Sequence, residues 1–219
     1  MVAARNEEAR VHDTVAALAA IPGVSEVVVV DDRSGDGTAR RASAAGATVI
    51  RARSGSGKGS AVEWALARLP PADVWLFVDA DLGMSAASLA PVLEPVVAGK
   101  ADLAIGSFEA GPGGGFGIVK RLAGLTIRAL CGFLAKAPLS GQRAITGGCL
   151  AAVRPLASGF GMETGMTIDA VRAGFRVVEV PVNGVSHRST GRGPRGFLHR
   201  GRQGIHVLRA AAARAIGLW

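Results

Sequence analysis

The stretch Val74-Trp75-Leu76-Phe77-Val78-Asp79-Ala80-Asp81 runs from five apolar residues directly into two carboxylates. An apolar run of this length is typical of a strand that is buried on both faces of a sheet. Two carboxylates spaced two apart at the exit of such a strand can hold a hard divalent cation, Mg²⁺ or Mn²⁺, together with phosphate oxygens. A capped turn also explains an isolated Asp-x-Asp, so the surrounding sequence has to distinguish a metal site from a capped turn.

An earlier part of the chain repeats this pattern. Four consecutive valines, residues 27–30, lead into Asp31-Asp32, and a polar turn follows over residues 33–38. An N-cap and turn cluster explains Asp36 and Thr38 but leaves the paired carboxylates unexplained. A carboxylate at this position can accept a hydrogen bond from the N–H of a uracil base.

Apolar runs and helical periodicities alternate along the chain. Strands are expected over residues 1–4, 27–30, 47–51, 74–78, 103–106, 144–153 and 176–182, and helices over 7–20, 38–45, 60–69, 86–98, 119–135 and 162–173. This order predicts an α/β fold with a Rossmann-like, mostly parallel sheet and helices on both faces. In such sheets ligands lie at the carboxyl ends of the strands, where both aspartate pairs fall. We expect a single domain over 1–185, with halves 1–107 and 108–185, and a basic tail over 186–219.

Gly57-Lys58-Gly59 follows the third expected strand. Ala52 and Gly59 occupy the positions at which a Walker phosphate loop needs Gly and Ser or Thr, which excludes that motif. A lysine between two glycines at a strand–helix junction is then either a nucleotide-phosphate contact or part of a solvated loop.

Composition limits the class of protein. The 219 residues are 49% hydrophobic and 19% charged, enough to bury a core and too apolar for a disordered chain. No apolar run reaches the length of a spanning helix, and the charged residues Arg5, Glu7 and Glu8 come too early for a signal peptide. Two cysteines provide no disulfide framework. A cytoplasmic protein is expected.

Four motifs occur in a fixed order: A-R-N-E-E at residues 4–8, V-V-D-D-R-S-G-D-G-T at 29–38, G-K-G-S-A at 57–61 and F-V-D-A-D-L at 77–82. Together they resemble the GT-A fold glycosyltransferases of family 2. Within that family they are most similar to dolichyl- and polyprenyl-phosphate sugar transferases and, more distantly, to glucosyl-3-phosphoglycerate synthase. The resemblance covers about residues 1–190 and implies the GT-A fold and the use of a nucleotide sugar.

The resemblance also implies roles for residues in the first half. The nucleoside pocket is expected at Ala4, Glu7 and Asp32, with Asp31 beside them. Lys58 is expected to contact the nucleotide and Asp79 the ribose or the sugar. Asp81 is expected to be the main metal ligand. For Glu7, an acidic residue that favours the start of a helix remains the alternative.

The second half adds an acceptor side. Gln142 and Arg143 lie in a loop where the family faces its acceptor, and Arg143 can grip a phosphate with its guanidinium fork. Glu163 is the candidate base, although Thr164 replaces the second acid of the family's common Glu-Asp pair. Asp169 is expected to form a structural pair instead.

Two further residues follow the last expected strand. His187 corresponds to a histidine that completes the metal site in several relatives, and neutral imidazole is a normal ligand for Mn²⁺. Arg188 would neutralise the departing diphosphate. A surface histidine in an Arg-rich segment is the alternative reading of the same residues.

The resulting expectation is a metal-dependent glycosyltransferase that moves a sugar from a nucleotide diphosphate sugar, first of all a UDP-sugar, to an acceptor bearing a phosphate or a hydroxyl group. A lipid phosphate and a small phosphorylated molecule are both candidate acceptors. The alternative is a nucleotidylyltransferase, but residues 3–8 lack the Gly-rich phosphate loop that it needs. Binding of nucleic acid is not expected, because few aromatic residues accompany the arginines of the tail.

The tail carries the excess of positive charge. The net charge is +8, and residues 186–219 contain seven arginines and no acidic residue. A helix over 203–219 would align Ile205, Leu208, Ala212, Ile216 and Trp219 in one apolar stripe. That stripe either lies on an anionic membrane at the inner face, as a peripheral contact, or docks on the enzyme's own core or on a second copy in a homodimer.

Overall fold

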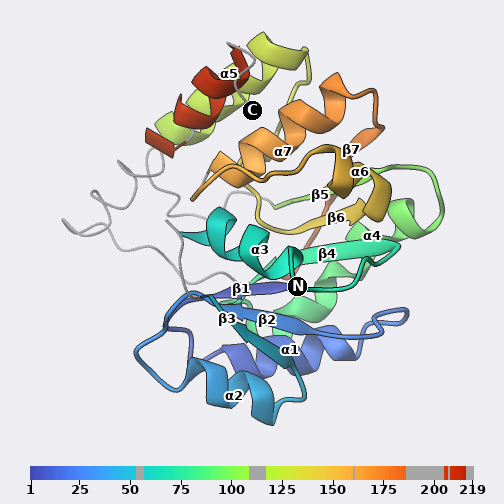
Figure 1. Ribbon diagram of the computed structural model, residues 1–219. Helices are drawn as coiled ribbons and strands as arrows, with labels where there is room; N and C mark the ends of the chain where they lie inside the picture. Colours follow the sequence, from blue (N-terminus) through green and yellow to red (C-terminus); the bar gives the residue numbers. More distant parts are fainter. Residues whose placement is uncertain (53–56, 109–116, 160, 186–204, 207, 216–219) are drawn as a thin grey trace.

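A seven-stranded sheet with strand order β3-β2-β1-β4-β6-β5-β7 forms the centre of the molecule (Figure 1). The structure is a computed structural model that describes residues 1–52, 57–108, 117–159, 161–185, 205–206 and 208–215. The strands are β1 (Val2–Ala4), β2 (Val28–Asp31), β3 (Thr48–Arg51), β4 (Val74–Asp79), β5 (Leu103–Ser107), β6 (Arg143–Thr146) and β7 (Val177–Pro181). All pair in parallel except β6, which runs antiparallel to both β4 and β5. The predicted mostly parallel α/β sheet is confirmed.

Helices cover both faces of this sheet. They are α1 (Val11–Ala19), α2 (Thr38–Ala44), α3 (Lys58–Leu66), the 3-10 turn η1 (Gly83–Leu89), α4 (Ala90–Val97), α5 (Ile118–Cys131), α6 (Gly147–Ala152) and α7 (Gly161–Arg172). One hydrophobic core joins α1, η1 and α4 to the sheet, and a second joins α3, α6 and α7. Burial of the apolar stripes on these helices is the main driving force that holds the layers together.

Two predicted elements end at different places. The strand expected over 144–153 stops at Thr146, whose hydroxyl accepts a hydrogen bond from Cys149 N (3.2 Å) and so begins α6. Gly147 cannot carry a side chain there, because a Cβ would lie 2.4 Å from the carbonyl oxygen of Ala72. The helix expected over 119–135 ends at Cys131, since Gly132 takes the left-handed conformation (φ 77°) that closes helices.

The tail contributes a helix that packs on α7. Residues 205–206 and 208–215 are helical, and we call them the C-terminal helix. Its buried side consists of Ala210 and Arg214, and the Arg214 guanidinium donates to both carboxylate oxygens of Asp169. The predicted structural pairing of Asp169 is confirmed. The close approach of the C-terminal helix to α7 depends on Gly165, where a Cβ would lie 2.7 Å from the Arg214 guanidinium.

The predicted apolar stripe of the tail faces outward. Ile205, Leu208 and Ala212 are exposed, whereas Ile216 and Trp219 lie outside the described residues. The alternative in which this stripe docks on the enzyme's own core is therefore wrong for its described members, because Ala210 and Arg214 occupy that side of the helix. Among the residues the structure describes, no helix has both the length and the apolar character to cross a membrane.

Candidate active site

The carboxyl ends of three neighbouring strands bring the predicted donor residues to one edge of the sheet. In the register of β1, Ala4 lies opposite Asp31 of β2, and Ala3 lies opposite Asp79 of β4. Adjacent strands are about 4.8 Å apart, so the two aspartates stand roughly two strand spacings from each other. The placement of both aspartate pairs at this edge is confirmed.

An ion-paired cluster forms the middle of the edge. The ammonium nitrogen of Lys58 lies 2.5 Å from Asp79 Oδ1 and 2.8 Å from Glu163 Oε1. Lys58 is the first residue of α3, where Gly57 takes φ 88° to turn the chain into the helix, and Glu163 is in the first turn of α7. The side chains of Lys58 and Glu163 are 16% and 4% exposed, which makes this a largely buried arrangement.

The two carboxylates fix the charge of the lysine. Burial on its own would lower the pKa of Lys58, but the negative charges of Asp79 and Glu163 outweigh it and raise that pKa above its usual range. Lys58 is therefore a permanent cation. It can stabilise negative charge, and it cannot accept a proton at neutral pH.

The antiparallel strand β6 delivers a further residue to the same cluster. Because Arg143 at the start of β6 pairs with Phe77 of β4, the loop before it arrives where β4 ends. Gln142 is buried and donates from Nε2 to Asp79 Oδ2 over 3.1 Å. The sequence did not single out Gly141, yet a Cβ there would lie 2.5 Å from both Lys58 Nζ and Asp79 Oδ2.

Arg143 bonds to the loop before β6 and to α7. Its guanidinium is fully buried and donates to the carbonyl oxygen of Ser140 (2.7 Å) and to Thr167 Oγ1 (2.8 Å). Burial lowers the pKa of Arg143 to about 10, against the opposing effect of Glu163 and Glu179, so it remains cationic at neutral pH. The structure gives Arg143 the role of bracing the loop against α7 in place of the predicted acceptor contact.

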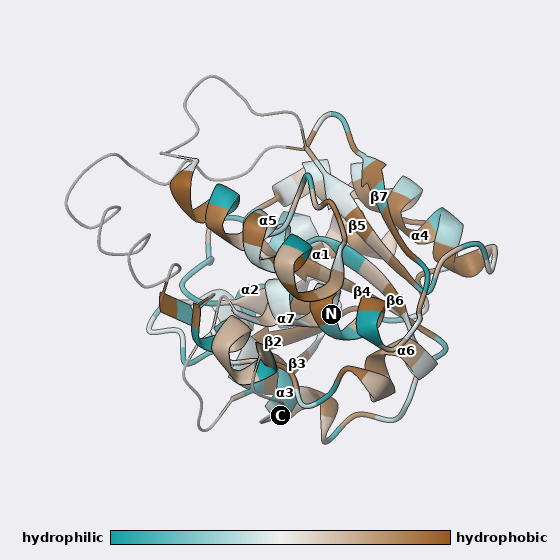
Figure 2. Cartoon of the chain, turned by 90° about the horizontal axis from the view of Figure 1, so that it is seen from above, coloured by the Kyte–Doolittle hydropathy of each residue, from teal (hydrophilic) through white to brown (hydrophobic). Residues whose placement is uncertain are grey.

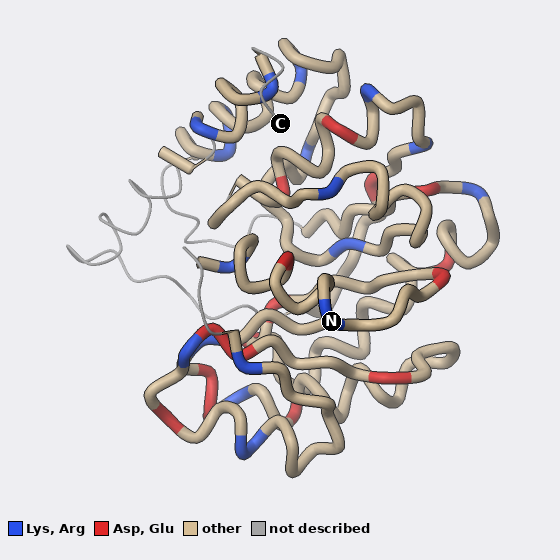
Figure 3. The backbone as a smooth tube through the Cα atoms, in the orientation of Figure 1, with Lys and Arg blue, Asp and Glu red and all other residues tan. Residues whose placement is uncertain are grey.

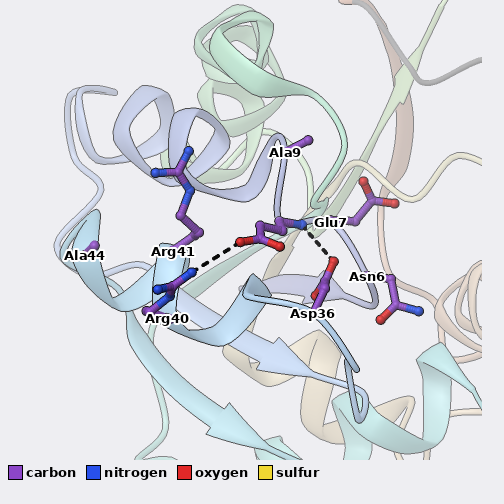
Figure 4. A pocket seen from close by; sticks show the side chains of 8 residues that line it. Asn6, Glu7, Ala9, Asp36, Arg40, Arg41 and Ala44 are labelled. Atoms are coloured by element: carbon purple, nitrogen blue, oxygen red, sulfur yellow. Dashed lines mark hydrogen bonds and ion pairs between the residues drawn. The ribbon is translucent and has the colours of Figure 1, made fainter.

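The loops that follow β1 and β2 form a pocket of about 820 Å³ beside α2 (Figure 4). There the guanidinium of Arg40 donates to the carboxylate of Glu8 over 3.4 Å. The backbone nitrogen of Glu8 in turn donates to the carboxylate of Asp36 over 3.3 Å. The hydroxyl of Thr38 holds the pKa of Asp36 below its usual range. The lining residues are Asn6, Glu7, Glu8, Ala9, Asp36, Arg40, Arg41 and Ala44.

Hydrogen bonds lock these two loops to each other. Asn6 Oδ1 accepts from Gly35 N, and the backbone nitrogen of Glu7 donates to Thr38 Oγ1, both over 2.9 Å. Asn6 and Arg33 take φ values of 55° and 57°, and no other described non-glycine residue has a positive φ. Such strain persists only where the surroundings enforce it, and it concentrates at functional sites.

Asp31 and Asp32 are both almost fully buried beneath these loops. Asp31 Oδ1 accepts from Ser34 N (3.0 Å), and Asp32 Oδ1 accepts from Arg33 Nε (3.3 Å). Arg5 lies 3.7 Å from the other oxygen of Asp32. Buried carboxylates need such partners, and these are supplied mainly by the loops themselves.

Helix α1 and its N-cap residue, Arg10, hold the turn that carries Asp81. Arg10 Nη1 donates to the carbonyl oxygen of Asp81 (2.8 Å), while Thr14 Oγ1 bonds both the carbonyl oxygen of Ala80 (2.9 Å) and the nitrogen of Gly83 (2.8 Å). No local sequence pattern indicates these roles of Arg10 and Thr14, because the bonds join residues 66 to 71 positions apart.

The carboxylates at this edge fit a divalent cation that takes most of its ligands from elsewhere. Within the described part of the chain, no group of three Asp, Glu, His or Cys side chains is placed to hold a metal. Asp79 is engaged by Lys58 and Gln142, and Asp81 is half-buried next to it. Mg²⁺ and Mn²⁺ commonly bind through one or two carboxylates plus phosphate oxygens and water, which suits so small a set. The predicted residues His187 and Arg188 lie outside the described residues.

Known proteins share both the sequence pattern and the fold. Glycosyltransferase AglJ from Haloferax volcanii is 31% identical over 163 residues, which cover 73% of this chain and 54% of AglJ. This chain thus spans about half the length of that curated relative.

Solved structures of glucosyl-3-phosphoglycerate synthase from Mycobacterium tuberculosis superpose over almost the whole chain. A complex with Mn²⁺, UDP and phosphoglyceric acid gives a TM-score of 0.81 at 28% identity, covering 97% of this chain and 76% of that one. A complex with Mn²⁺, UDP-glucose and phosphoglyceric acid gives 0.77 at 27% identity, covering 96% and 78%. The model of the family Glycosyl transferase family 2 matches residues 1–155 of this chain. The chain therefore belongs to glycosyl transferase family 2.

Proposed function

We propose that this protein is a metal-dependent glycosyltransferase that moves a sugar from a UDP-sugar to an acceptor bearing a phosphate or hydroxyl group. The observation that carries the proposal is the contact of Lys58 with Asp79 and Glu163 at the strand edge that also presents Asp31 and Asp81. A permanent cation among carboxylates at the end of parallel strands suits a nucleotide diphosphate, whose charge a cation and a metal ion can share.

The donor would lie across the ends of β1, β2 and β4. Ala4, Glu7, Asp31 and Asp32 would surround the nucleoside, with Asp79 near the ribose or sugar and Lys58 near the nucleotide. The solved synthase complexes with UDP and UDP-glucose support a uridine nucleotide for this edge. On binding, a phosphate oxygen would compete with Asp79 and Glu163 for the ammonium group of Lys58.

Asp81 would hold the divalent ion, with His187 as a further ligand. The complexes of the synthase with Mn²⁺ or with Mg²⁺ support either ion. A bound ion would supply stabilisation of the negative charge on the leaving diphosphate. Arg188 would add positive charge to the same group.

Glu163 and Gln142 would serve the acceptor side. If the acceptor is a hydroxyl group, Glu163 would take its proton once Lys58 has moved toward the nucleotide. A phosphate acceptor is already ionised and needs no strong base. The phosphoglyceric acid bound to the synthase supports a small phosphorylated acceptor, and a lipid phosphate is the other candidate.

A product assay tests the proposed reaction. The protein is incubated with UDP-glucose or GDP-mannose and Mn²⁺, together with either 3-phosphoglycerate or a polyprenyl phosphate, and in a separate reaction with UTP and glucose 1-phosphate. We expect release of UDP from UDP-glucose that depends on the acceptor. Release of pyrophosphate from UTP would show a nucleotidylyltransferase and overturn the proposal.

A further inference from the structure

Helix α5 and the C-terminal helix lie next to each other on the outer side of α7 (Figure 1). Arg172, in the last turn of α7, joins them. Its Nε donates to the carbonyl oxygen of Leu130 in α5 (3.0 Å), and its Nη1 donates to the carbonyl oxygen of Arg214 in the C-terminal helix (2.8 Å). The two helices therefore form one continuous surface, which we call the α5 face.

The α5 face carries most of the exposed large apolar side chains. Seven such side chains are at least half exposed in the described part of the chain, and five of them are on this face or directly after it. The five are Ile118 and Leu125 of α5, Leu134 just beyond it, and Ile205 and Leu208 of the C-terminal helix. Single exposed apolar residues need no explanation, but a cluster marks an interaction site.

Positive charge accompanies these apolar residues. An open groove of about 680 Å³ runs along α5, with Lys120, Arg121, Arg128 and Lys136 beside Leu125 and Leu134, and no acidic residue lines it. Exposed Ile118, Arg121, Leu125 and Arg128 follow one another at spacings of three and four, so apolar and basic side chains alternate along one side of α5. Figure 2 shows this mixture of hydropathy on α5, and Figure 3 shows the basic residues on both helices.

We propose that the α5 face binds peripherally to the surface of an anionic lipid bilayer. Apolar side chains interleaved with Lys and Arg match the boundary between headgroups and acyl chains, where the cations meet lipid phosphates and the apolar groups leave water. Charge complementarity favours this occupant, since the groove offers cations and no anions. Each basic side chain near such a surface strengthens binding by about fivefold, and salt weakens that contribution.

Lipid binding by the α5 face would give the protein a location, and it does not depend on the proposed chemistry. It would bring the enzyme to the layer in which a lipid phosphate presents its headgroup. The α5 face and the donor edge also consist of different residues. Lipid binding and nucleotide binding can therefore succeed or fail separately.

Vesicle co-sedimentation of the full chain tests the proposal. We expect the protein to pellet with vesicles of phosphatidylcholine and phosphatidylglycerol at low salt, and to remain in the supernatant with phosphatidylcholine alone. The double variant Lys120→Glu/Leu125→Glu should lower the partition coefficient at least tenfold, because it reverses one charge and places another among the apolar groups. UDP binding by this variant should equal that of the wild type, which shows that it is folded.

The matched control is Lys100→Glu/Val97→Glu, which makes the same kinds of change at exposed positions at the end of α4. It should pellet as the wild type does. The proposal is overturned if the wild type fails to pellet with anionic vesicles, or if both double variants lose binding equally. It is also overturned if the α5 variant changes only the sedimentation coefficient of the protein, since the face would then be a contact between copies.

Discussion

Replacement of Lys58 by methionine should lower turnover of the nucleotide-sugar donor by about 100- to 1,000-fold, the range found when one preorganised donor to a developing charge is removed. Lys58 makes the ion pairs with Asp79 and Glu163, and methionine keeps its approximate volume without the charge. The released UDP is measured at saturating donor. Lys100→Met, at an exposed position after α4, is the control and should remain fully active.

A measurement of stability distinguishes the structural contribution of Lys58 from its contribution to nucleotide binding. Lys58→Met leaves the buried carboxylate of Glu163 without its ion pair, so the free energy of unfolding should also fall. Adding Glu163→Gln removes that unpaired charge and should recover much of the stability without recovering UDP affinity. If the double variant regained both, Lys58 would be a structural residue with no contact to the nucleotide.

Loss of the ion pair between α7 and the C-terminal helix should have the largest effect on stability. Asp169 and Arg214 are 1% and 3% exposed, and removal of one partner leaves a buried charge uncompensated. Arg214→Met should therefore lower the free energy of unfolding by about 3–5 kcal/mol. Urea unfolding followed by the fluorescence of the three tryptophans, Trp64, Trp75 and Trp219, measures this loss.

Two variants show whether the charge is responsible. The double variant Asp169→Leu/Arg214→Met replaces the pair by apolar groups and should be much more stable than Arg214→Met alone. Arg40→Met removes an ion pair of Glu8 that is largely exposed and should leave stability nearly unchanged. Equal losses in Arg214→Met and Arg40→Met would contradict a special role for the buried pair.

The sequence predicted most of the sheet because local patterns report burial. Four valines before Asp31 and five apolar residues before Asp79 favour buried strands, and the aspartates then mark the edge where the strands end. The structure buries β2 along its whole length, whereas the first three residues of β4, 74–76, are only partly buried. The strand expected over 144–153 was too long, because the glycines at 147–148 begin helix α6. Its N-cap, Thr146, is recognisable only once the end of β6 is known.

Contacts between distant residues were not accessible from the sequence. The bond from Gln142 to Asp79 follows from the antiparallel direction of β6, and no local pattern specifies that direction. The same holds for Arg143, which was predicted to contact the acceptor and is instead buried, with its guanidinium donating to Thr167 on α7. For the tail, periodicity placed Ile205, Leu208 and Ala212 on one side of a helix, as the described residues confirm. Only the burial of Ala210 and Arg214 shows which side of that helix faces the enzyme.

Calorimetric titration of UDP tests the central claim most directly, because it reports on the donor edge without needing to know the acceptor. The wild type should bind UDP in the presence of Mn²⁺ and lose that affinity in EDTA. Asp81→Asn should lower the Mn²⁺-dependent affinity at least about 100-fold, since loss of even an outer partner of a metal site commonly lowers affinity 10- to 100-fold. Equal UDP affinity in Mn²⁺ and EDTA, or in Asp81→Asn and the wild type, would contradict a metal-dependent donor site at the ends of β1, β2 and β4.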